Sequence, residues 1–436
     1  MIGLRLVEMR TAPCTGNHVA PAARSLRAAL VLLLSVGATA CLSSKRLSYI
    51  YEPTYGVESP QFANALEGLA CRMVPGNEVT LLNDGDELFP ALRKAMEEAK
   101  CSINIETYIF AEGTVGDAFA RLLADKARQG VAVRLLVDGV GARLGRLEPY
   151  MRVNGVRVEI YKPLTVFTLH RIGDRTHRKI VTVDGRVAFT GGFAFDDRWQ
   201  GHARDAAEWR DVAVRLEGPI VSQLQRVFMQ DWMHTTGEVL HDDGQFPPVE
   251  MPGNVLAQAV ASSGADPSSL AKLHYFAPIQ AARRRIWIEN AYFVPDRDFR
   301  RALMRAAERG VDVRLLVPGR LTDIRAVRWA SRYHYRELLR AGVRIYEYRP
   351  TMLHSKLMVV DGIFTSIGSM NFVSRTMKKN AEANVAIYDR AFAQLVEAVY
   401  EEDLQRSERV TLEQWRHRGL FERFREAFFA LFSLAY

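Results

Sequence analysis

The sequence predicts an α/β protein made of two similar lobes, which are related by an internal repeat with pseudo-twofold symmetry. Three pairs of segments support this prediction, because each segment of the first half has a counterpart in the second half. The pairs are INIETYIF (103–110) with IWIENAYF (286–293), RQGVAVRLLVDG (128–139) with ERGVDVRLLVPG (308–319), and NGVRVEIYKP (154–163) with AGVRIYEYRP (341–350). Self-similarity of this kind indicates one supersecondary unit used twice.

Each half of the chain follows the order strand, helix, strand, helix, strand. In the first half, INIETYI and VAVRLLV are rich in β-branched residues, and the segment between them has apolar residues at helical spacing and ends in glycine. Alternating strands and helices predict parallel strands covered by helices. We expect a first lobe at 76–236, a turn-rich linker at 237–268 that contains the strand-like VLAQAVA, and a second lobe at 269–436.

The beginning of the chain has a different character. Two arginines precede the apolar run 28–40, whose length suits the core of a signal peptide and is short for a membrane span. Small residues directly before Cys41 make this segment similar to a bacterial lipoprotein signal; an ordinary signal peptide and an uncleaved anchor are the alternatives. We therefore expect a leader or anchor at 1–40, an irregular lead-in at 41–75, and a bacterial cell-envelope protein attached to the membrane through lipidated Cys41.

Composition narrows the class of protein without deciding it. The chain has 436 residues, enough for two sizeable cores, and a formal net charge of +8. A basic surface suits polyanions, either nucleic acid or anionic lipid headgroups, although an arginine-rich surface that contacts only water is the plainer interpretation. The four cysteines lack the spacing of a CxxC or Cys/His zinc site, and the sequence offers no obvious metal cluster. We expect neither a metal nor a cofactor.

One short pattern occurs twice at equivalent places in the repeat. THRKIVTVDGRVAFTGG (176–192) and LHSKLMVVDGIFTSIGS (353–369) share a histidine, a lysine two residues later, an aspartate, and a closing pair of small residues. Successive side chains of a strand point to opposite faces, so histidine and lysine share one face and the aspartate lies on the other. This alternation assigns chemistry to the histidine and lysine, and support of the scaffold to the aspartate.

Two histidines and two lysines around one anionic centre can carry out phosphoryl chemistry. A neutral imidazole is a competent nucleophile, and a protonated imidazole is a general acid. A fixed ammonium stabilises negative charge on a phosphoryl oxygen. One histidine would attack phosphorus while the other protonates the leaving alkoxide, and this scheme needs no metal.

The two copies match the HKD motif of the phospholipase D superfamily, and within it the chain resembles bacterial cardiolipin synthases. The resemblance covers about residues 79–436 and includes the phrases ETYIF, WRDVAVRLEGPIV, AYFVPD and EANVAIYD. It implies two phospholipase D-like α/β sandwich lobes packed with both motif strands at their interface. It also implies a monomer that acts on a phospholipid, phosphatidylglycerol, at the bacterial membrane, without nucleic acid as a partner.

The resemblance gives each motif residue a role. His177 would be the nucleophile that forms a phosphohistidine, and His354 the general acid and later the base, although the sequence itself cannot choose between the two histidines. Lys179 and Lys356 would bind the phosphate. The implied catalytic set is His177, Lys179, Asp184, His354, Lys356 and Asp361.

Further residues would bind the phosphate or orient the histidines. Asn371 in GSMN would donate a hydrogen bond, and the small residues Ser369 and Gly192 would let the backbone come close to the phosphate. Family members carry a carboxylate downstream of each motif, which fixes the tautomer of the histidine. Asp211 and Glu382 lie 34 and 28 residues after their histidines, and an acid at a strand end or on the surface is the alternative for each. One departure from the family is Ala194, which stands in the first copy where the second has asparagine.

Several functions remain open at this stage. Phosphatidyl transfer to a second phosphatidylglycerol leads, and hydrolysis of phospholipid to phosphatidic acid is the main alternative. A nuclease is less favoured, because nucleases of this superfamily are short chains with one motif that dimerise. A membrane-bound scaffold without activity would leave the intact HxK pairs unexplained. The last segment, 419–436, predicts an amphipathic helix whose phenylalanines lie either in a membrane interface or on the protein's own core.

Overall fold

Strands form where the sequence is richest in β-branched residues, and each repeat builds the same parallel core. In the computed structural model, three strands of the first repeat pair in parallel, and so do three strands of the second. They are β2 (Ser102–Thr107), β3 (Ala132–Asp138) and β4 (Arg157–Tyr161), and β9 (Arg285–Asn290), β11 (Asp312–Pro318) and β12 (Arg344–Tyr348). The predicted α/β class and the repeated strand order are confirmed.

The structure describes residues 49–69, 71–163, 173–263, 270–373 and 376–431. The chain divides into an N-terminal unit, Met1–Ile50, and a second unit, Tyr51–Tyr436, to which every element below belongs. The predicted leader at 1–40 lies outside the described residues, as does Cys41. No helix among the described residues combines the length and apolar character that a membrane crossing requires.

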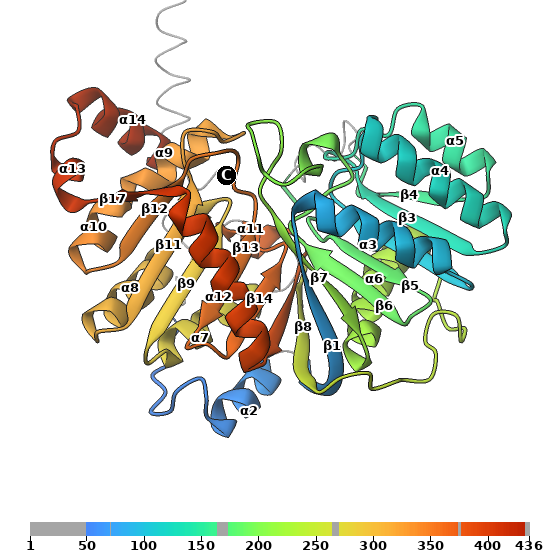
Figure 1. Ribbon diagram of the computed structural model, residues 1–436, viewed down its shortest axis with the longest axis horizontal. Coiled ribbons are helices and arrows are strands. Elements are labelled where there is room, and N and C mark those ends of the chain that lie inside the picture. The colour runs from blue at the N-terminus through green and yellow to red at the C-terminus, as the bar shows by residue number, and fades with distance from the viewer. Residues whose placement is uncertain (1–48, 70, 164–172, 264–269, 374–375, 432–436) are drawn as a thin grey trace, which may run out of the picture. The chain divides into compact units, whose positions relative to one another are not determined.

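The remaining strands extend the two parallel cores into one sheet. Its order is β17-β12-β11-β9-β13-β14-β16-β8-β1-β7-β6-β5-β2-β3-β4, with β1 and β8 paired at the centre (Figure 1). A separate two-stranded ladder joins β10 (Phe293–Val294) to β15 (Phe372–Val373). The other strands are β1 (Val74–Asn83), β5 (Ile180–Val183), β6 (Val187–Gly191), β7 (Val212–Glu217), β8 (Val255–Ser262), β13 (Lys356–Val360), β14 (Phe364–Gly368), β16 (Glu382–Tyr388) and β17 (Ser407–Val410).

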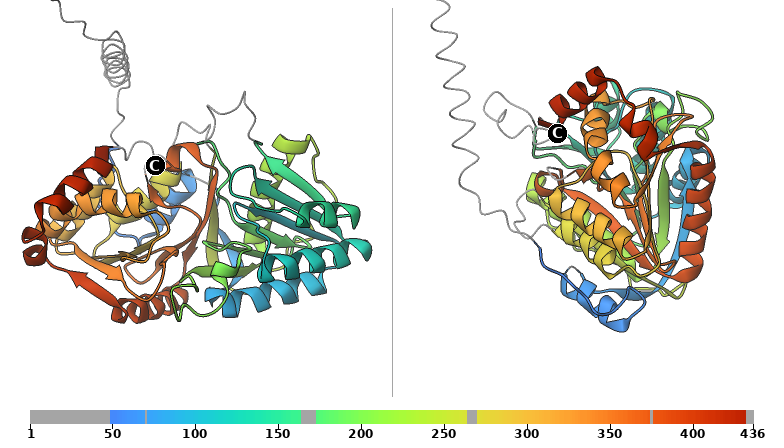
Figure 2. Two further views of the ribbon diagram at one scale, coloured as in Figure 1. Left: turned by 90° about the horizontal axis from the view of Figure 1, so that it is seen from above. Right: turned by 90° about the vertical axis from the view of Figure 1, so that its left-hand side faces the viewer.

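Helices flank the strands of each half (Figures 1 and 2). The predicted helix between the first two parallel strands is α4, which begins after Gly113 and ends before Gln129. The helices of the first half are α3 (Asp84–Glu98), α4 (Thr114–Arg128), α5 (Leu147–Val153) and α6 (Pro219–Thr236), with the short 3-10 helix η2 (Asp197–Trp199). Those of the second half are α7 (Leu270–Ala281), α8 (Arg297–Glu308), α9 (Arg325–Tyr333), α10 (Tyr335–Arg340), α11 (Thr376–Lys379), α12 (Arg390–Gln405), α13 (Leu412–Arg416) and α14 (Leu420–Leu431).

The sheet is mixed, whereas the sequence predicted only parallel strands. The motif strands β5 and β13 run antiparallel to β2 and β9, and each continues through a tight turn into its antiparallel neighbour. These turns require left-handed backbone at their first residues, Asp184 with φ 51° and Asp361 with φ 52°, followed in each case by glycine. The turn residues therefore fix the antiparallel pairs β5–β6 and β13–β14, whereas the antiparallel pairing with β2 and β9 arises from tertiary packing.

Two regions outside the predicted lobes are more regular than the sequence suggested. The lead-in predicted at 41–75 contains the helix α2 (Pro60–Leu69), which begins with proline at a position where a missing N–H costs nothing. Its Phe62 is fully buried and packs edge-on against Phe364 of β14, with ring centroids 6.0 Å apart. The linker predicted at 237–268 contains β8, which lies in the middle of the sheet, so it contributes to the core.

The halves meet through an apolar core that faces both motif strands. Ile180 of β5 and Leu357 of β13 occupy equivalent repeat positions, and both lie in this cluster. Helices α6 and α12 add Leu224 and Val396 to it. Val181 points the other way, into the separate core of the first lobe. The alternation predicted for the motif strands is therefore present, and the strands are fixed from both faces.

The motif aspartates tie these strands to the scaffold. The Asp184 carboxylate accepts hydrogen bonds from the backbone N–H groups of Lys100, Cys101 and Ser102, each at 2.7 Å. Asp361 does the same for three consecutive N–H groups at the start of β9, at 2.7–2.8 Å; these belong to Arg283, Arg284 and Arg285. Each aspartate thus caps the turn that leads into the first parallel strand of its lobe.

This arrangement predicts a loss of stability on substitution of Asp361, which is 1% exposed. Asp361→Ala leaves backbone donors without their acceptor and should lower the free energy of unfolding by about 3 kcal/mol, whereas Asp361→Asn, which keeps one oxygen and tolerates left-handed φ, should cost about 1 kcal/mol. Urea unfolding measures both, with the exposed Asp243→Ala as the control. An unchanged unfolding midpoint in Asp361→Ala would contradict the capping role.

Candidate active site

Both motif histidines are fixed across the boundary between the lobes. Each directly precedes the motif strand region, and its backbone N–H donates to a carbonyl of the other lobe: His177 to Ala381 at 2.8 Å, and His354 to Arg210 at 2.7 Å. Isolated β-bridges between Thr176 and Ala381, and between Arg210 and Leu353, accompany these bonds. The two motifs are therefore connected by backbone contacts that obey the pseudo-twofold symmetry.

The orienting carboxylates are exchanged between the lobes. His177 Nδ1 lies 3.0 Å from Glu382 Oε2, and His354 Nδ1 lies 2.9 Å from Asp211 Oδ2. The sequence analysis predicted both acids as orienting residues and assigned each to the histidine of its own lobe, whereas each contacts the histidine of the other lobe. With Nδ1 held by a carboxylate, Nε2 of each imidazole carries the lone pair and is the atom available for chemistry.

The small residues that end the motif make room for these carboxylates, each in its own way. Ser369 Oγ donates to Glu382 Oε2 at 2.6 Å. At the equivalent position, a Cβ on Gly192 would come within 2.3 Å of Asp211 Oδ1, so only glycine fits there. Trp199 Nε1 instead supplies the donor to Asp211, at 2.8 Å. Ser369 and Gly192 thus act on the orienting acids.

The two motif lysines are buried beside the histidines. Lys356 Nζ lies 2.8 Å from Nδ1 and 3.0 Å from Nε2 of His354, and Lys179 Nζ donates to the backbone oxygen of His177 at 2.9 Å. Burial lowers the pKa of Lys179 to about 8 and that of Lys356 to about 7, and the charge of Lys179 contributes to the second shift. Two ammonium groups that influence each other in a dry site favour an anionic ligand, because its charge would offset theirs.

The histidines are neutral in this environment. Burial lowers the pKa of His177, although Glu382 opposes the shift. The pKa of His354 is held well below its usual range by burial and by the charges of Lys356 and Lys179. Burial also raises the pKa of Asp211 to about 6, with Lys356 acting in the opposite direction. Both imidazoles are therefore bases with a free lone pair near neutral pH.

Aromatic side chains distinguish the two histidines. His354 is enclosed by Trp199, Trp209 and Tyr292, with ring centroids 5.1, 5.3 and 6.1 Å from its own. His177 has Tyr108 at 5.2 Å, and its side chain is 13% exposed, against 6% for His354. Sequence reasoning missed these aromatic residues as site components. Trp209, Tyr108 and Tyr292 did stand within quoted family phrases, whereas Trp199 gave no signal.

Behind each motif lies a pair of buried acids that sequence reasoning also missed. Glu106 and Glu289 occupy equivalent repeat positions, and each has a neighbouring aspartate: Asp231 for the first and Asp403 for the second. Burial and the adjacent aspartate raise the pKa of both glutamates well above the usual range. Buried arginines balance the aspartates, with Arg178 2.8 Å from Asp231 and Arg210 2.7 Å from Asp403. Arg210 is the residue whose carbonyl holds the His354 backbone.

Other predicted residues lie apart from this cluster or differ between the copies. Asp184 and Asp361 cap turns at the far ends of β5 and β13, so their inclusion in the catalytic set is not supported by the geometry. Asn371 is 3% exposed, and its Oδ1 lacks a hydrogen-bond partner among the described residues. Ala194, its counterpart, is fully buried. No group of three or more His, Cys, Asp or Glu side chains within the described residues is placed to hold a metal ion.

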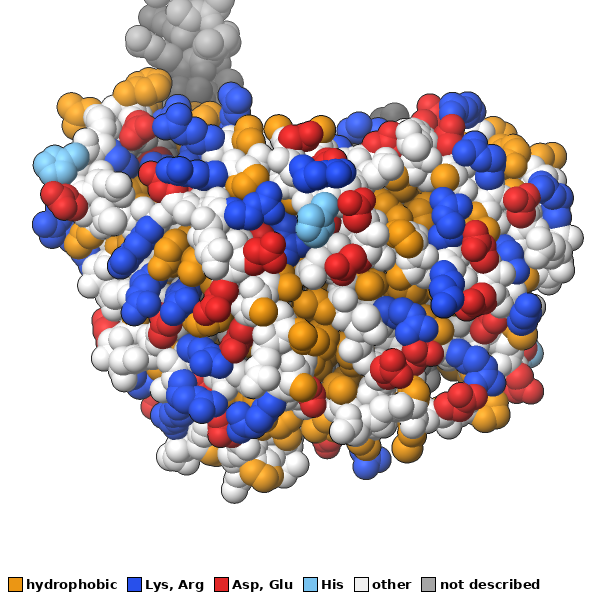
Figure 3. All heavy atoms as spheres, viewed as in Figure 1, with side chains coloured by type: hydrophobic (Ala, Val, Ile, Leu, Met, Phe, Trp, Pro, Cys, Tyr) orange, Lys and Arg blue, Asp and Glu red, His pale blue; other side chains and the backbone are white. Residues whose placement is uncertain are grey.

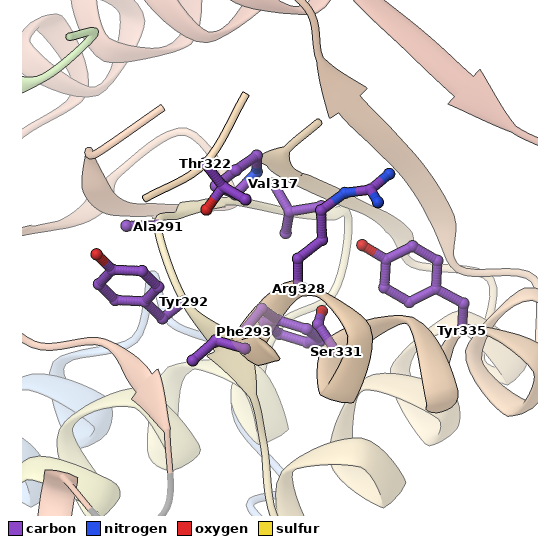
Figure 4. A pocket seen from close by; sticks show the side chains of 10 residues that line it. Ala291, Tyr292, Phe293, Val317, Thr322, Arg328, Ser331 and Tyr335 are labelled. Atoms are coloured by element: carbon purple, nitrogen blue, oxygen red, sulfur yellow. The ribbon is translucent and has the colours of Figure 1, made fainter. Parts of the chain in front are cut away.

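A small hollow lies between Tyr292 and the surface loop before α9. It is lined by the segment that follows β9, the end of β11, and α9 (Figure 4). The Tyr292 hydroxyl donates to Asp323 Oδ2 of that loop at 2.6 Å, and burial together with this acid raises its pKa well above the usual range. The loop at Asp323 is thus one side chain away from His354.

Comparison with known proteins gives the same family. The family model described as "Cardiolipin synthase, PLD-like domain" matches residues 92–232 and 275–404. A probable cardiolipin synthase of Bacillus subtilis is 36% identical over 82% of this chain and 72% of its own length, and a cardiolipin synthase of Geobacillus kaustophilus is 37% identical over the same shares.

The fold is also shared with a solved structure. Phosphatidylserine synthase of Haemophilus influenzae superposes with a TM-score of 0.66 at 12% identity, covering 86% of this chain and 97% of that one. The motif spacing, the two-lobe α/β fold and these relatives agree, and the chain belongs to the phospholipase D-like cardiolipin synthase family.

Proposed function

We propose that the protein transfers the phosphatidyl group of one phosphatidylglycerol to a second, which gives cardiolipin and glycerol. The observation that carries the proposal is the pair of histidine–carboxylate contacts exchanged between the lobes, His177 with Glu382 and His354 with Asp211. The names of the relatives supply the substrate class. Two buried lysines beside these pairs supply the positive charge that a phosphodiester needs.

The first step forms a covalent intermediate. Nε2 of one histidine attacks phosphorus, the bond from phosphorus to the glycerol oxygen breaks, and the second histidine gives its Nε2 proton to that oxygen. In the free protein Lys356 and Lys179 disfavour this proton on His354. The negative charge of the bound diester offsets both lysines, and so it favours protonation of His354 when substrate is present.

The second step reverses the first with a different alcohol. The headgroup hydroxyl of a second phosphatidylglycerol gives its proton to the same histidine and attacks phosphorus, and the bond from phosphorus to nitrogen breaks. Because one diester replaces another, the step has little net driving force. Water as the acceptor would give phosphatidic acid instead, so exclusion of water from this buried cluster favours transfer.

The surroundings of the two histidines support His177 as the nucleophile and His354 as the acid and base. The attacking nitrogen must reach phosphorus, and His177 is the more exposed of the two. His354 is enclosed by three aromatic rings, with Lys356 close to both ring nitrogens, an arrangement better suited to moving a proton than to holding a bulky lipid adduct.

Localisation and assembly extend this proposal. A cell-envelope protein held at the membrane would find both substrates at high local concentration, and the predicted lipid at Cys41 would supply the attachment. That anchor, the monomeric state and the absence of a nucleic-acid partner stay predictions.

Product analysis tests the reaction. The full chain incubated with phosphatidylglycerol should yield cardiolipin and glycerol by mass spectrometry, and His177→Ala should lower kcat on the order of 10⁴-fold. His241→Ala, at an exposed histidine, is the control. Phosphatidic acid as the sole product would establish hydrolysis, and no turnover of any phospholipid would refute the lipid assignment.

Trapping of the adduct distinguishes the roles of the histidines. A p-nitrophenyl ester of phosphatidic acid has a leaving group that needs no proton, so His354→Ala should release nitrophenolate in a burst and retain a phosphatidyl group on His177. Peptide mass spectrometry locates the adduct. An adduct on His354 in the His177→Ala variant would mean that the roles are the reverse of those proposed.

The lysine pKa values predict how activity varies with pH. Lys356 and Lys179, with pKa values of about 7 and 8, lose their positive charge as pH rises, so kcat/KM should fall above roughly pH 7–8. Below about pH 6 it should fall again, because Asp211 is protonated and no longer accepts from His354. Lys356→Arg keeps its charge and should move the alkaline fall to higher pH. If the alkaline fall does not move in that variant, Lys356 is not the group that titrates.

A further inference from the structure

The C-terminal helix α14 exposes most of its large apolar side chains and buries an acidic one. Its one fully buried side chain among those described is a carboxylate, Glu426, which is 3% exposed. Phe421 and Phe424 are 74% and 69% exposed, and Leu420 and Leu431 are still more exposed. A surface helix of a water-soluble domain normally buries its apolar stripe and exposes its acids. The outward apolar face of α14 therefore calls for a partner.

Ion pairs fix this orientation. Glu426 accepts from Arg332 of α9 at 3.1 Å and from Arg418. Beside them, Phe429 packs on Trp329 of α9 with ring centroids 4.7 Å apart. Turning the phenylalanines inward would break these pairs and leave buried charges without partners. The apolar face is thus held outward by the fold.

The C-terminal end of α14 lies on the side of α9 that is nearer to the active site. Glu426 contacts Arg332 and Phe429 contacts Trp329, so α14 and α9 run antiparallel, and the end of α14 lies toward the start of α9. The loop at that start exposes two further apolar side chains, Leu321 and Ile324.

This loop connects directly to the candidate site. Asp323, between the two apolar side chains, accepts from the hydroxyl of Tyr292, whose ring lies 6.1 Å from that of His354. Exposed apolar side chains therefore lie both on α14 and on the loop that reaches the second histidine.

Exposed arginines accompany the apolar side chains at both ends. Arg416 and Arg423 lie next to Leu420 and Phe424 on α13 and α14, while Arg320 and Arg325 flank Leu321 and Ile324. At the upper left of Figure 3, over α13 and α14, apolar side chains lie among basic and acidic ones. Apolar side chains beside cations match the boundary between acyl chains and anionic headgroups.

We propose that α14 and the loop before α9 form a docking surface for an anionic lipid bilayer, which places the entrance of the site at the headgroup level. This inference rests on the proposed function, since it gives that reaction its route to lipid. The apolar side chains of the docking surface are Leu420, Phe421, Phe424, Leu431, Leu321 and Ile324.

Vesicle binding without turnover tests the docking surface separately from the reaction. The full chain is mixed with phosphatidylcholine vesicles that do or do not contain phosphatidic acid, and bound protein is measured by flotation. The double variant Phe421→Glu/Phe424→Glu should bind acidic vesicles at least about tenfold more weakly. Val153→Glu/Leu395→Glu, at exposed apolar positions elsewhere, should bind like the parent chain. Equal binding of the two double variants would overturn the proposal.

A site-specific reporter separates this surface from any other membrane attachment of the chain. In Phe424→Trp, the emission of the added indole, taken as the difference from the parent chain, should shift to shorter wavelength on acidic vesicles and be quenched by brominated acyl chains. An indole that stays in water while the protein is bound would assign binding to another segment, such as residues 1–48, and overturn the proposal. The proposal is also overturned if the emission shift occurs without vesicles and accompanies self-association measured by sedimentation. A second copy of the protein, rather than a membrane, would then cover the apolar face.

The reaction and the docking fail in different variants. His177→Ala should lose transfer while it keeps vesicle binding and the indole shift in the Phe424→Trp background. The melting temperature of Phe421→Glu/Phe424→Glu shows whether this variant is folded like the parent chain. If its melting temperature is lower, the Phe424→Trp experiment alone tests the docking surface.

Discussion

The hydrogen bonds between each histidine and the carboxylate of the opposite lobe are the constraint on which the site depends. His177 needs Glu382, and His354 needs Asp211, and all four side chains are largely buried. A buried carboxylate without its partner costs far more than an exposed one, so neither lobe can complete its half of the site alone. The lobes must therefore dock before either imidazole has a fixed tautomer, which explains why backbone bonds at Ala381 and Arg210 reinforce the same crossing.

Burial then sets the chemistry of the groups that this crossing brings together. It weakens the hold of both lysines on their protons and keeps both imidazoles neutral, and it leaves an excess of positive charge that only an anion relieves. The same low-dielectric environment raises the pKa of Glu106 and Glu289 behind the motifs, which disfavours negative charge that would offset the lysines. The combined effect of burial and lysine charge, rather than one strong contact, therefore favours the binding of a phosphodiester.

The sequence was sufficient to predict what is local and repeated, and insufficient for what depends on docking. Strand alternation placed His177 with Lys179 and sent Asp184 to the scaffold, because that pattern needs only the backbone. The partner of each carboxylate could not be predicted, since it depends on which lobe faces which. Trp199 was missed for the same reason: its indole reaches Asp211 only after the lobes fold. The antiparallel motif strands and the central place of β8 are likewise results of tertiary pairing.

Sequence differences between the two repeats give the two histidines different roles. A perfect repeat would offer two equivalent histidines, and either could attack or donate. Here the first copy has Gly192 and Trp199 around Asp211, and this arrangement encloses His354 in aromatic rings, whereas the second copy uses Ser369 on Glu382 and leaves His177 more open. Ala194 in place of asparagine adds to the difference, because it leaves a polar side chain on one side only. The departures from symmetry therefore separate a histidine suited to a covalent bond from one suited to proton transfer.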